Sequence, residues 1–491
     1  MKNLPKARIP IATYRLQFTP DFRFKDATKI ISYLHELGIT DIYSSPYLKA
    51  KEGSTHGYNV VDYNELNSEL GSLKEYNEMI DEIAKYNMGQ ILDIVPNHMC
   101  VTSKENQWWM DVLENGPSAH YAKFFDINWQ PAKKELEQKV LLPILGEQYG
   151  KVLENQELKL CFKDGTFFIS YYEHVLPIQP KTYLLILNHE IENLKSLLDE
   201  DDPILIELLS IITALHYLPD YTEKDQVKIK ERYREKEIVK QRLGRLYDSS
   251  QQIKAFIDKN VMIFNGEKGN IHNFDLLDNL LRQQVYRLSF WCVAIEEINY
   301  RRFFDINELA AVRVEDPDVY NDTHKLIFKL IREGKVTGLR VDHPDGLYDP
   351  SAYLYNLQRD AFIQLCLSEE TSPDNQTHET LGKKFDNEYV KNPSYIPFYI
   401  LGEKILSGEE KQPQEWPIYS LTGYRFLNTI NNIFVETKNS DVFKSIYHEF
   451  IKKELRFDCL VYKSKKLIIE DSLSSEINML AYHLNRLSEY D

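Results

Sequence analysis

Apolar and polar residues alternate with two distinct periods along the first hundred positions. Some stretches alternate every second residue, as a half-buried β-strand does, and others place apolar residues on one face of an α-helix. The pattern predicts strands at residues 9–18, 39–44 and 90–95, and helices at residues 26–37 and 72–87. A β-α-β-α-β order is typical of a parallel sheet whose strands are joined by crossover helices.

The pattern changes between residues 100 and 300, where short β-like stretches at 159–162 and 166–171 are mixed with helical ones. A long helical stretch at residues 223–246 intersperses acids with bases, which favours a solvated or domain-bridging helix over a nucleic-acid-binding arm. We interpret this region as a large, mostly helical insertion after strand 3. The predicted domains are the first part of a barrel at 1–99, an inserted lid or substrate domain at 100–310, and the second part of the barrel at 311–491.

The alternation of strands and helices resumes after the insertion. It predicts helices at residues 325–332, 351–367 and 473–488, strands at 338–341, 399–402 and 417–420, and a polar loop at 368–392. About six strands are then present of the eight in a complete barrel. The predicted fold class is therefore α/β, an incomplete (β/α)8 TIM-type barrel with a large insertion.

Composition limits the partners of this 491-residue chain. A formal net charge of -16 argues against nucleic acid or an anionic membrane, because phosphate surfaces would repel it. The five cysteines are scattered without a CxxC pair, which favours a reducing compartment over a disulfide framework or a zinc site. No signal peptide and no membrane-spanning stretch is apparent, so we expect a cytoplasmic protein.

Candidate chemistry lies at the ends of two predicted strands. Asp342 follows the strand at 338–341, and Glu403 follows the strand at 399–402. Strands that deliver polar groups to one rim are how a barrel builds an active site, and two carboxyl groups roughly 5 Å apart suit a retaining glycosidase. Arg340 lies two residues before Asp342, so both side chains face the same way and the guanidinium would keep Asp342 ionised. The alternatives are a structural Arg–Asp pair and an exposed Glu403 paired with Lys404.

Other polar residues near the predicted rim suit a sugar, with weaker signals. Asn97 and His98 follow the third strand and could bond to hydroxyl groups, although a lone histidine there is more often structural. Tyr58 lies in a glycine-containing loop and could stack on a sugar, although such a tyrosine usually just packs. No His, Cys or Asp cluster has the spacing of a metal site, and we expect neither a metal nor a cofactor.

At these residues the chain resembles the α-amylase superfamily of glycoside hydrolases. It carries three of that superfamily's four short signature regions, at 93–98, 338–343 and 402–403. Longer strings resemble one family within it, the maltooligosyltrehalose synthases. They lie at residues 12–17, 45–47, 53–58, 300–305, 313–317, 342–347, 403–406 and 422–424.

The resemblance implies that Asp342 is the nucleophile and Glu403 the general acid/base. It implies further substrate-binding residues at the attacked sugar and at a neighbouring acceptor subsite: Tyr58, His98, Arg340, His343, Asp345, Lys404, His56 and Asn97. Two departures stand out. Asn59 replaces an aspartate that usually follows the His-Gly-Tyr string, and the superfamily's His-Asp pair after the seventh strand is absent from the sequence.

The implied reaction is an intramolecular transglycosylation that converts the reducing-end α-1,4 linkage of a maltooligosaccharide into an α,α-1,1 linkage. The alternatives are an α-1,4-glucan hydrolase of the amylase type and an inactive glucan-binding fragment. A parallel barrel that lacks two strands leaves open edges, which are aggregation hazards. We therefore expect an α-glucan substrate and, as a further partner, a second polypeptide that supplies the missing strands.

Overall fold

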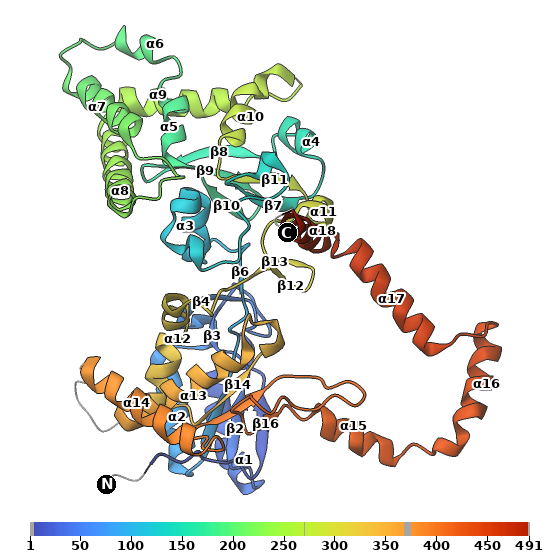
Figure 1. Cartoon of the computed structure of the whole chain (residues 1–491). Coiled ribbons are helices and arrows are strands. Elements are labelled where there is room, and N and C mark those ends of the chain that lie inside the picture. The colour runs from blue at the N-terminus through green and yellow to red at the C-terminus, as the bar shows by residue number, and fades with distance from the viewer. Residues whose placement is uncertain (1–3, 270, 368–374, 490–491) are drawn as a thin grey trace. The chain divides into compact units, whose positions relative to one another are not determined.

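The computed structural model describes residues 4–269, 271–367 and 375–489 (Figure 1). Backbone contacts divide the chain into two compact units. Unit 1 contains the residues up to Cys100 together with Leu309–Ser464, and unit 2 contains Val101–Glu308 and the residues from Lys465 onward. The chain therefore leaves unit 1 once, returns to it, and leaves it again.

Unit 1 is built on a six-stranded parallel sheet in the order β1-β2-β5-β14-β15-β16. Its strands are β1 Thr13–Leu16, β2 Asp41–Ser44, β5 Gly89–Ile94, β14 Gly338–Val341, β15 Tyr399–Gly402 and β16 Ser420–Leu421. β5 and β14 are buried along their whole length, as central parallel strands are, although they carry Gln90, Asp93 and Arg340. The sheet confirms the predicted fold class, an α/β half-barrel of six strands in an incomplete TIM-type barrel.

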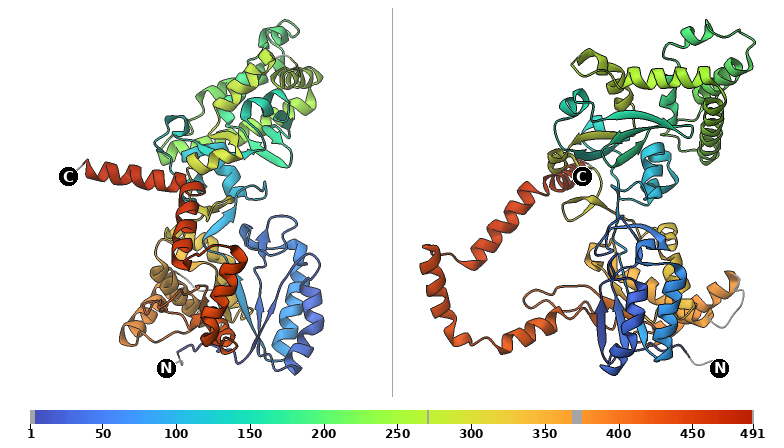
Figure 2. Two further views of the ribbon diagram at one scale, coloured as in Figure 1. Left: turned by 90° about the vertical axis from the view of Figure 1, so that its right-hand side faces the viewer. Right: turned by 180° about the vertical axis from the view of Figure 1, so that it is seen from behind.

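Helices of unit 1 alternate with these strands. They are α1 Phe24–Glu36, α2 Leu73–Lys85, α12 Pro317–Arg332, α13 Pro350–Leu367, α14 Asn375–Lys391, α15 Tyr424–Ile433 and α16 Ser440–Ile451. α1 and α2 lie side by side along the sheet (Figure 2). α2 begins at a capping box, in which the Ser72 hydroxyl accepts from the Glu75 backbone and the Glu75 carboxylate accepts from the Ser72 backbone.

α14 corrects the predicted loop at residues 368–392. Residues 368–374 of that prediction lie outside the described residues, but the remainder is mostly helical. The sequence looks polar because only three positions of the helix are apolar in a spaced pattern: Leu381, Phe385 and Tyr389. They pack at i, i+4 and i+8 onto a cluster that includes Phe362 and Leu367 of α13. This packing stabilises a helix that the mostly polar composition of the segment does not predict.

Two short antiparallel pairs extend unit 1 beyond its main sheet. β3 Leu48–Ala50 pairs with β4 Val60–Leu66, and the turn between them holds the glycine-containing loop. β6 His98–Cys100 pairs with the end of β13 Ile306–Ala311. These pairs place residues 53–58 and 97–98 in defined backbone conformations.

Apolar side chains remain exposed on the last helices of unit 1. α15 and α16 bury no side chain, and Figure 1 shows them as successive separate rods. Their apolar residues recur with helical spacing, and among them Phe426, Ile433, Phe443 and Phe450 are 69–84% exposed. An apolar stripe of this kind normally faces a core.

Unit 2 combines small sheets with helices. Its strands are β7 Val140–Leu145, β8 Lys159–Lys163, β9 Thr166–Tyr171, β10 His174–Pro177, β11 Tyr286–Phe290 and β12 Arg302–Phe303. Its helices are α3 Gln107–Asn115, α4 Tyr149–Glu154, α5 Tyr183–Leu187, α6 Ile191–Lys195, α7 Pro203–Tyr217, α8 Gln226–Ser249, α9 Gln251–Phe264, α10 Asp275–Arg282, α11 Ala294–Glu297 and α18 Ser474–Ser488, while α17 Phe457–Asp471 spans the boundary with unit 1. The predicted strand pair at 159–171 is the β8–β9 hairpin, and β7 pairs with β11 in parallel.

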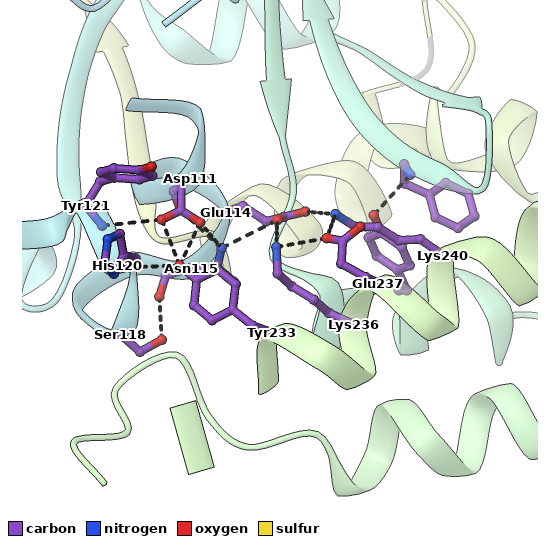
Figure 3. A network of polar contacts seen from close by, with 12 residues as sticks. Asp111, Glu114, Asn115, Ser118, His120, Tyr121, Tyr233, Lys236, Glu237 and Lys240 are labelled. Atoms are coloured by element: carbon purple, nitrogen blue, oxygen red, sulfur yellow. Dashed lines mark hydrogen bonds and ion pairs between the residues drawn. The ribbon is translucent and has the colours of Figure 1, made fainter. Parts of the chain in front are cut away.

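A buried ion network joins α3 to α8 in unit 2 (Figure 3). Glu114 on α3 pairs with Lys236 and, at 2.5 Å, with Lys240, both on α8. Glu237 pairs with the same two lysines at 3.1 and 3.2 Å. Two acids therefore balance two bases, which explains why a helix of highly charged sequence has a buried face.

A search of the described residues for membrane-spanning helices found none with the length and apolar character that crossing a bilayer requires. The same described residues contain no group of three or more histidine, cysteine, aspartate or glutamate side chains arranged to hold a metal ion.

Candidate active site

Arg340 is the centre of a carboxylate cluster at the C-terminal ends of three adjacent strands. Its Nη1 donates to Asp93 of β5 at 2.7 Å and to Asp342, just after β14, at 2.6 Å. Its Nη2 lies 3.1 Å from a carboxylate oxygen of Glu403, which follows β15. Because Arg340 and Asp93 are register partners in the parallel ladder, the sheet itself fixes their separation. The structure thus brings Asp342, Glu403 and Arg340 together at one rim.

The cluster holds more negative than positive charge in a buried place. Asp93 is fully buried, and Arg340 and Asp342 are each 6% exposed. Burial raises the pKa of Asp342 to about 7, and Asp93 and Glu403 add to the rise, while Arg340 opposes it. Burial likewise raises the pKa of Asp93, against the lowering effect of Arg340. One guanidinium cannot fully compensate three carboxyl groups.

Glu403 lies in a wetter position than Asp342. Its side chain is 23% exposed, compared with 9% for Asp342. One of its carboxylate oxygens accepts a hydrogen bond from the backbone N–H of His343 at 3.0 Å. His343 adopts the left-handed conformation, with φ of 44°, as the chain turns out of β14. The two acids therefore differ in environment although they share one arginine.

Tyr58 joins the cluster from the loop between β3 and β4. Its hydroxyl donates to Asp93 at 2.6 Å, and the Arg340 guanidinium lies 5.8 Å from the centre of its ring. His56 stacks on Tyr58 at 5.9 Å, and its Nδ1 accepts from the Tyr58 backbone. Asn59, which replaces the usual aspartate, accepts instead from the Ser54 hydroxyl within the same loop.

The other predicted binding residues lie around this cluster in separate contacts. Lys404 pairs with Asp345 and with Glu410, both at 2.8 Å. His98 is buried on β6, and its backbone carbonyl accepts from the Tyr63 hydroxyl at 2.9 Å. Asn97 is also buried, and its backbone carbonyl accepts from Val312. Their roles toward a sugar stay predictions.

Three residues of the cluster were not predicted as site residues. Asp93 accepts from Arg340, from Tyr58 and, at 2.9 Å, from the Tyr43 hydroxyl. Arg15 lies 5.2 Å from the Tyr43 ring centre and donates to the Tyr58 hydroxyl at 3.2 Å. A signal for Asp93 was available, because an acid between Leu92 and Ile94 in an apolar strand needs a buried partner. Arg15 and Tyr43 offered no comparable signal.

This arrangement can perform displacement chemistry at an acetal carbon. An ionised Asp342 could attack, and a protonated Glu403 could deliver its proton to a departing oxygen, since both face one rim. Arg340 would stabilise the carboxylate that forms when either acid loses its proton.

Comparisons with known proteins find one matching family model and several similar proteins. The family model "Alpha amylase, catalytic domain" matches residues 25–157. The solved structure of maltooligosyltrehalose synthase from Arthrobacter ramosus aligns with 97% of this chain at 29% identity and a TM-score of 0.66. A further crystal structure of a maltooligosyl trehalose synthase aligns with 97% of the chain at 28% identity and a TM-score of 0.63.

A protein of Mycobacterium tuberculosis (strain H37Rv), named as a maltooligosyl trehalose synthase, is 28% identical over 432 residues, or 87% of this chain. The alignments cover only 39% of that protein, and 45% and 46% of the two solved chains. This chain therefore spans less than half of the length of the relatives that it matches.

Proposed function

We propose, from the similarity of this chain to maltooligosyltrehalose synthases and to the α-amylase catalytic domain, that it carries the nucleophile and the acid/base of an intramolecular transglycosylation on maltooligosaccharides. The product would be a maltooligosyltrehalose. One observation supports this most strongly: Asp342 and Glu403, from neighbouring parallel strands, contact neighbouring nitrogens of one buried guanidinium. That arrangement suits the close pair of carboxyl groups of a retaining mechanism.

In the first step, an oxygen of Asp342 bonds to the anomeric carbon of the penultimate glucose. The α-1,4 bond to the last glucose breaks, and Glu403 gives its proton to the departing oxygen. In the second step, the anomeric hydroxyl of the released glucose attacks the same carbon, Glu403 takes its proton, and the bond to Asp342 breaks. Two inversions retain the α configuration, and no atom is gained or lost.

Electrostatics of the rim support these separate roles. The pKa of Asp342, raised by burial, means that its carboxylate is held with little stabilisation and gains by forming a covalent bond. Arg340 stabilises that carboxylate when it departs again. Tyr58, half-buried beside Arg340, offers a ring for the attacked sugar, while Lys404 and Asp345 offer a donor and an acceptor for the released glucose.

Further strands, from the rest of a longer chain or from a second polypeptide, would complete the barrel in this proposal. The parallel sheet ends at β1 and at the two-residue strand β16, and the following helices α15 and α16 leave their apolar stripes exposed. Further parallel strands beside β16 would give these stripes a core to cover. They would also supply the His-Asp pair that this sequence lacks.

The cellular setting belongs to the same proposal. Cys161, Cys292 and Cys459 form no disulfide in the described structure, and Cys459 is exposed. Exposed free thiols persist in a reducing environment. We therefore propose that the reaction takes place in the cytoplasm.

The proposed nucleophile can be tested on the purified chain with α-maltosyl fluoride, a donor that needs no protonation to leave. The Glu403→Gln variant should accumulate a maltosyl ester, because the second step lacks its base. Intact-mass spectrometry followed by peptide mapping should place the ester on Asp342. An ester on another residue, or none in either the wild-type chain or the variant, would contradict the proposal.

The reaction itself is tested with maltohexaose. Isomerisation lowers the number of reducing ends without shortening the chain, hydrolysis raises it, and a glucan-binding fragment changes nothing. Proton NMR of the anomeric region identifies an α,α-1,1 linkage directly. We expect isomerisation only when the chain is combined with a polypeptide that carries a His-Asp strand end, and full turnover by the purified chain alone would overturn the partner proposal.

A further inference from the structure

Unit 2 contains a cavity of about 730 Å³. Its wall is formed by α4, α10 and β11 together with residues near α11, and every lining residue belongs to unit 2. The catalytic cluster described above belongs entirely to unit 1. A cavity of this size accommodates a ligand of disaccharide to drug size.

Charges in the wall are balanced. The lining contains three basic and three acidic side chains: Lys139, Arg282, Arg287, Glu135, Asp278 and Glu297. Arg282 pairs with Asp278 at 2.8 Å, and Arg287 lies 3.8 Å from Glu297. A phosphate or a nucleotide would favour an excess of positive charge, and a metal ion an excess of carboxylates. A wall with equal numbers of donors and acceptors suits neutral hydroxyl groups.

Aromatic rings accompany these charges. Tyr149, Tyr286 and Phe290 line the cavity, and the Tyr149 hydroxyl donates to Asp278 at 2.8 Å. Trp291 follows Phe290, meets its ring edge-on at 5.7 Å, and is 54% exposed. Trp291 itself is outside the lining, next in the chain to the lining residue Phe290, and an exposed indole there offers a flat apolar face of the kind on which pyranose rings stack.

The wall of the cavity also contains two buried hydroxyl groups. Tyr286 is 1% exposed and Ser289 is 6% exposed, and neither hydroxyl has a hydrogen-bond partner among the described residues. A buried polar group without a partner is costly and uncommon in native proteins. Both residues line the cavity, but their hydroxyl oxygens are closed off from it, so a ligand rich in hydroxyl groups would reach them only after a side-chain rearrangement.

We propose that this cavity is a second binding site for an α-glucan, one that takes a maltosyl-sized end or branch of the chain. The identity of the sugar rests on the proposed function, and the existence of the site rests on unit 2 alone. The site would hold a polymeric substrate while its reducing end is exchanged at the rim, which raises the local concentration of ends.

Binding of maltohexaose can be followed in the full chain through the five tryptophan indole N–H signals, with [15N]tryptophan labelling and the Asp342→Asn substitution to prevent turnover. The Trp291→Phe variant assigns its signal. We expect the Trp291 signal to shift saturably, and Trp291→Ala to raise the dissociation constant of this site at least ten-fold. Tyr217→Ala, at an exposed tyrosine that ends α7, is the control and should change nothing.

Isothermal titration separates the two proposals. Two equivalents of maltohexaose should bind to the Asp342→Asn chain, and one should remain after Trp291→Ala or after Tyr58→Ala. A single equivalent that only Tyr58→Ala abolishes would overturn the second site and leave the proposed function standing. A single equivalent that only Trp291→Ala abolishes would overturn the rim as a glucan site, and no binding at all would overturn both.

Discussion

Two buried ion networks of this chain use the same residue types in opposite ways. At the rim of unit 1, three carboxyl groups surround Arg340, and the pKa of Asp342 is raised to about 7. In unit 2, Glu114 is as deeply buried, but Lys240 and Lys236 hold its pKa below the ordinary value despite burial (Figure 3). An excess of buried carboxyl groups over basic groups is typical of a functional site, whereas equal numbers of acids and bases are typical of a structural role.

The largest effect is expected when one of the three carboxyl groups around Arg340 is removed. Asp342→Asn should lower the rate of ester formation from α-maltosyl fluoride by the purified chain at least about 10⁴-fold, as loss of a nucleophile does. The same substitution should raise the free energy of unfolding by roughly 1 to 3 kcal/mol at pH 8, because it removes a carboxylate that burial disfavours. Urea unfolding measures this, with the exposed Asp345→Asn as the control. A less stable Asp342→Asn chain would show that the rim is an ordinary ion pair.

The balanced network should respond in the opposite direction. Glu114→Gln removes the buried acid that Lys236 and Lys240 share and leaves them with the half-exposed Glu237 alone, so it should cost about 3 kcal/mol of stability. Glu237→Gln, at a side chain that is 53% exposed, should cost less than about 1 kcal/mol. Trapping of the maltosyl ester on Asp342 should persist in both. A neutral or stabilising Glu114→Gln would remove the contrast between the two networks.

Part of the carboxylate cluster could be predicted from the sequence, because each strand that carries it is a short run of consecutive residues. The strands at 338–341 and 399–402 have the predicted bounds, and Asp342 and Glu403 follow them as expected. The sequence did not predict which residues of the other strands contact Arg340, Asp342 and Glu403. Asp93 and Arg340 lie 247 positions apart in the chain, and Arg15 and Tyr43 reach the cluster from two further strands that no local pattern connects with it.

Segments of mostly polar composition were also interpreted incorrectly from the sequence. α14 was expected to be a loop because its apolar residues become meaningful only against α13. The ion network of Glu114 was likewise hidden, since Lys236 and Lys240 look like the solvated face of a charged helix until α3 packs on them. Local periodicity defines elements well, but the partners of buried charges are a tertiary property.

The pH dependence sharpens the contrast further. Asp342 has a folded pKa of about 7, above its ordinary value of 3.8, so the folded state binds more protons than the unfolded state between these limits. Stability from this group is therefore full below pH 4 and is lost as the pH rises through 7. Glu114, whose pKa is lowered, contributes stability above its ordinary value and loses it on acidification.

Two measurements check these signs. The difference in unfolding free energy between the wild-type chain and Asp342→Asn should grow as the pH rises from 5 to 8. The rate of ester formation from α-maltosyl fluoride should rise over the same interval with a midpoint near 7, because only the carboxylate attacks. A rate that is flat from pH 5 to 8 would mean that Asp342 ionises at its ordinary value.

The smallest effect is expected from a residue that donates a hydrogen bond to one of the three carboxyl groups around Arg340. Tyr58→Phe removes the 2.6 Å hydrogen bond to Asp93 but keeps the ring beside Arg340. Asp93 then has one donor fewer and draws more on Arg340, so the pKa of Asp342 should rise further. The midpoint of the pH–rate profile should move up, and the rate at pH 7 should fall several-fold, in line with about 1 kcal/mol for one hydrogen bond. Tyr14→Phe, at an exposed tyrosine on β1, should leave both unchanged. A lower rate with an unmoved midpoint would mean that Tyr58 acts on the sugar alone and takes no part in balancing the cluster.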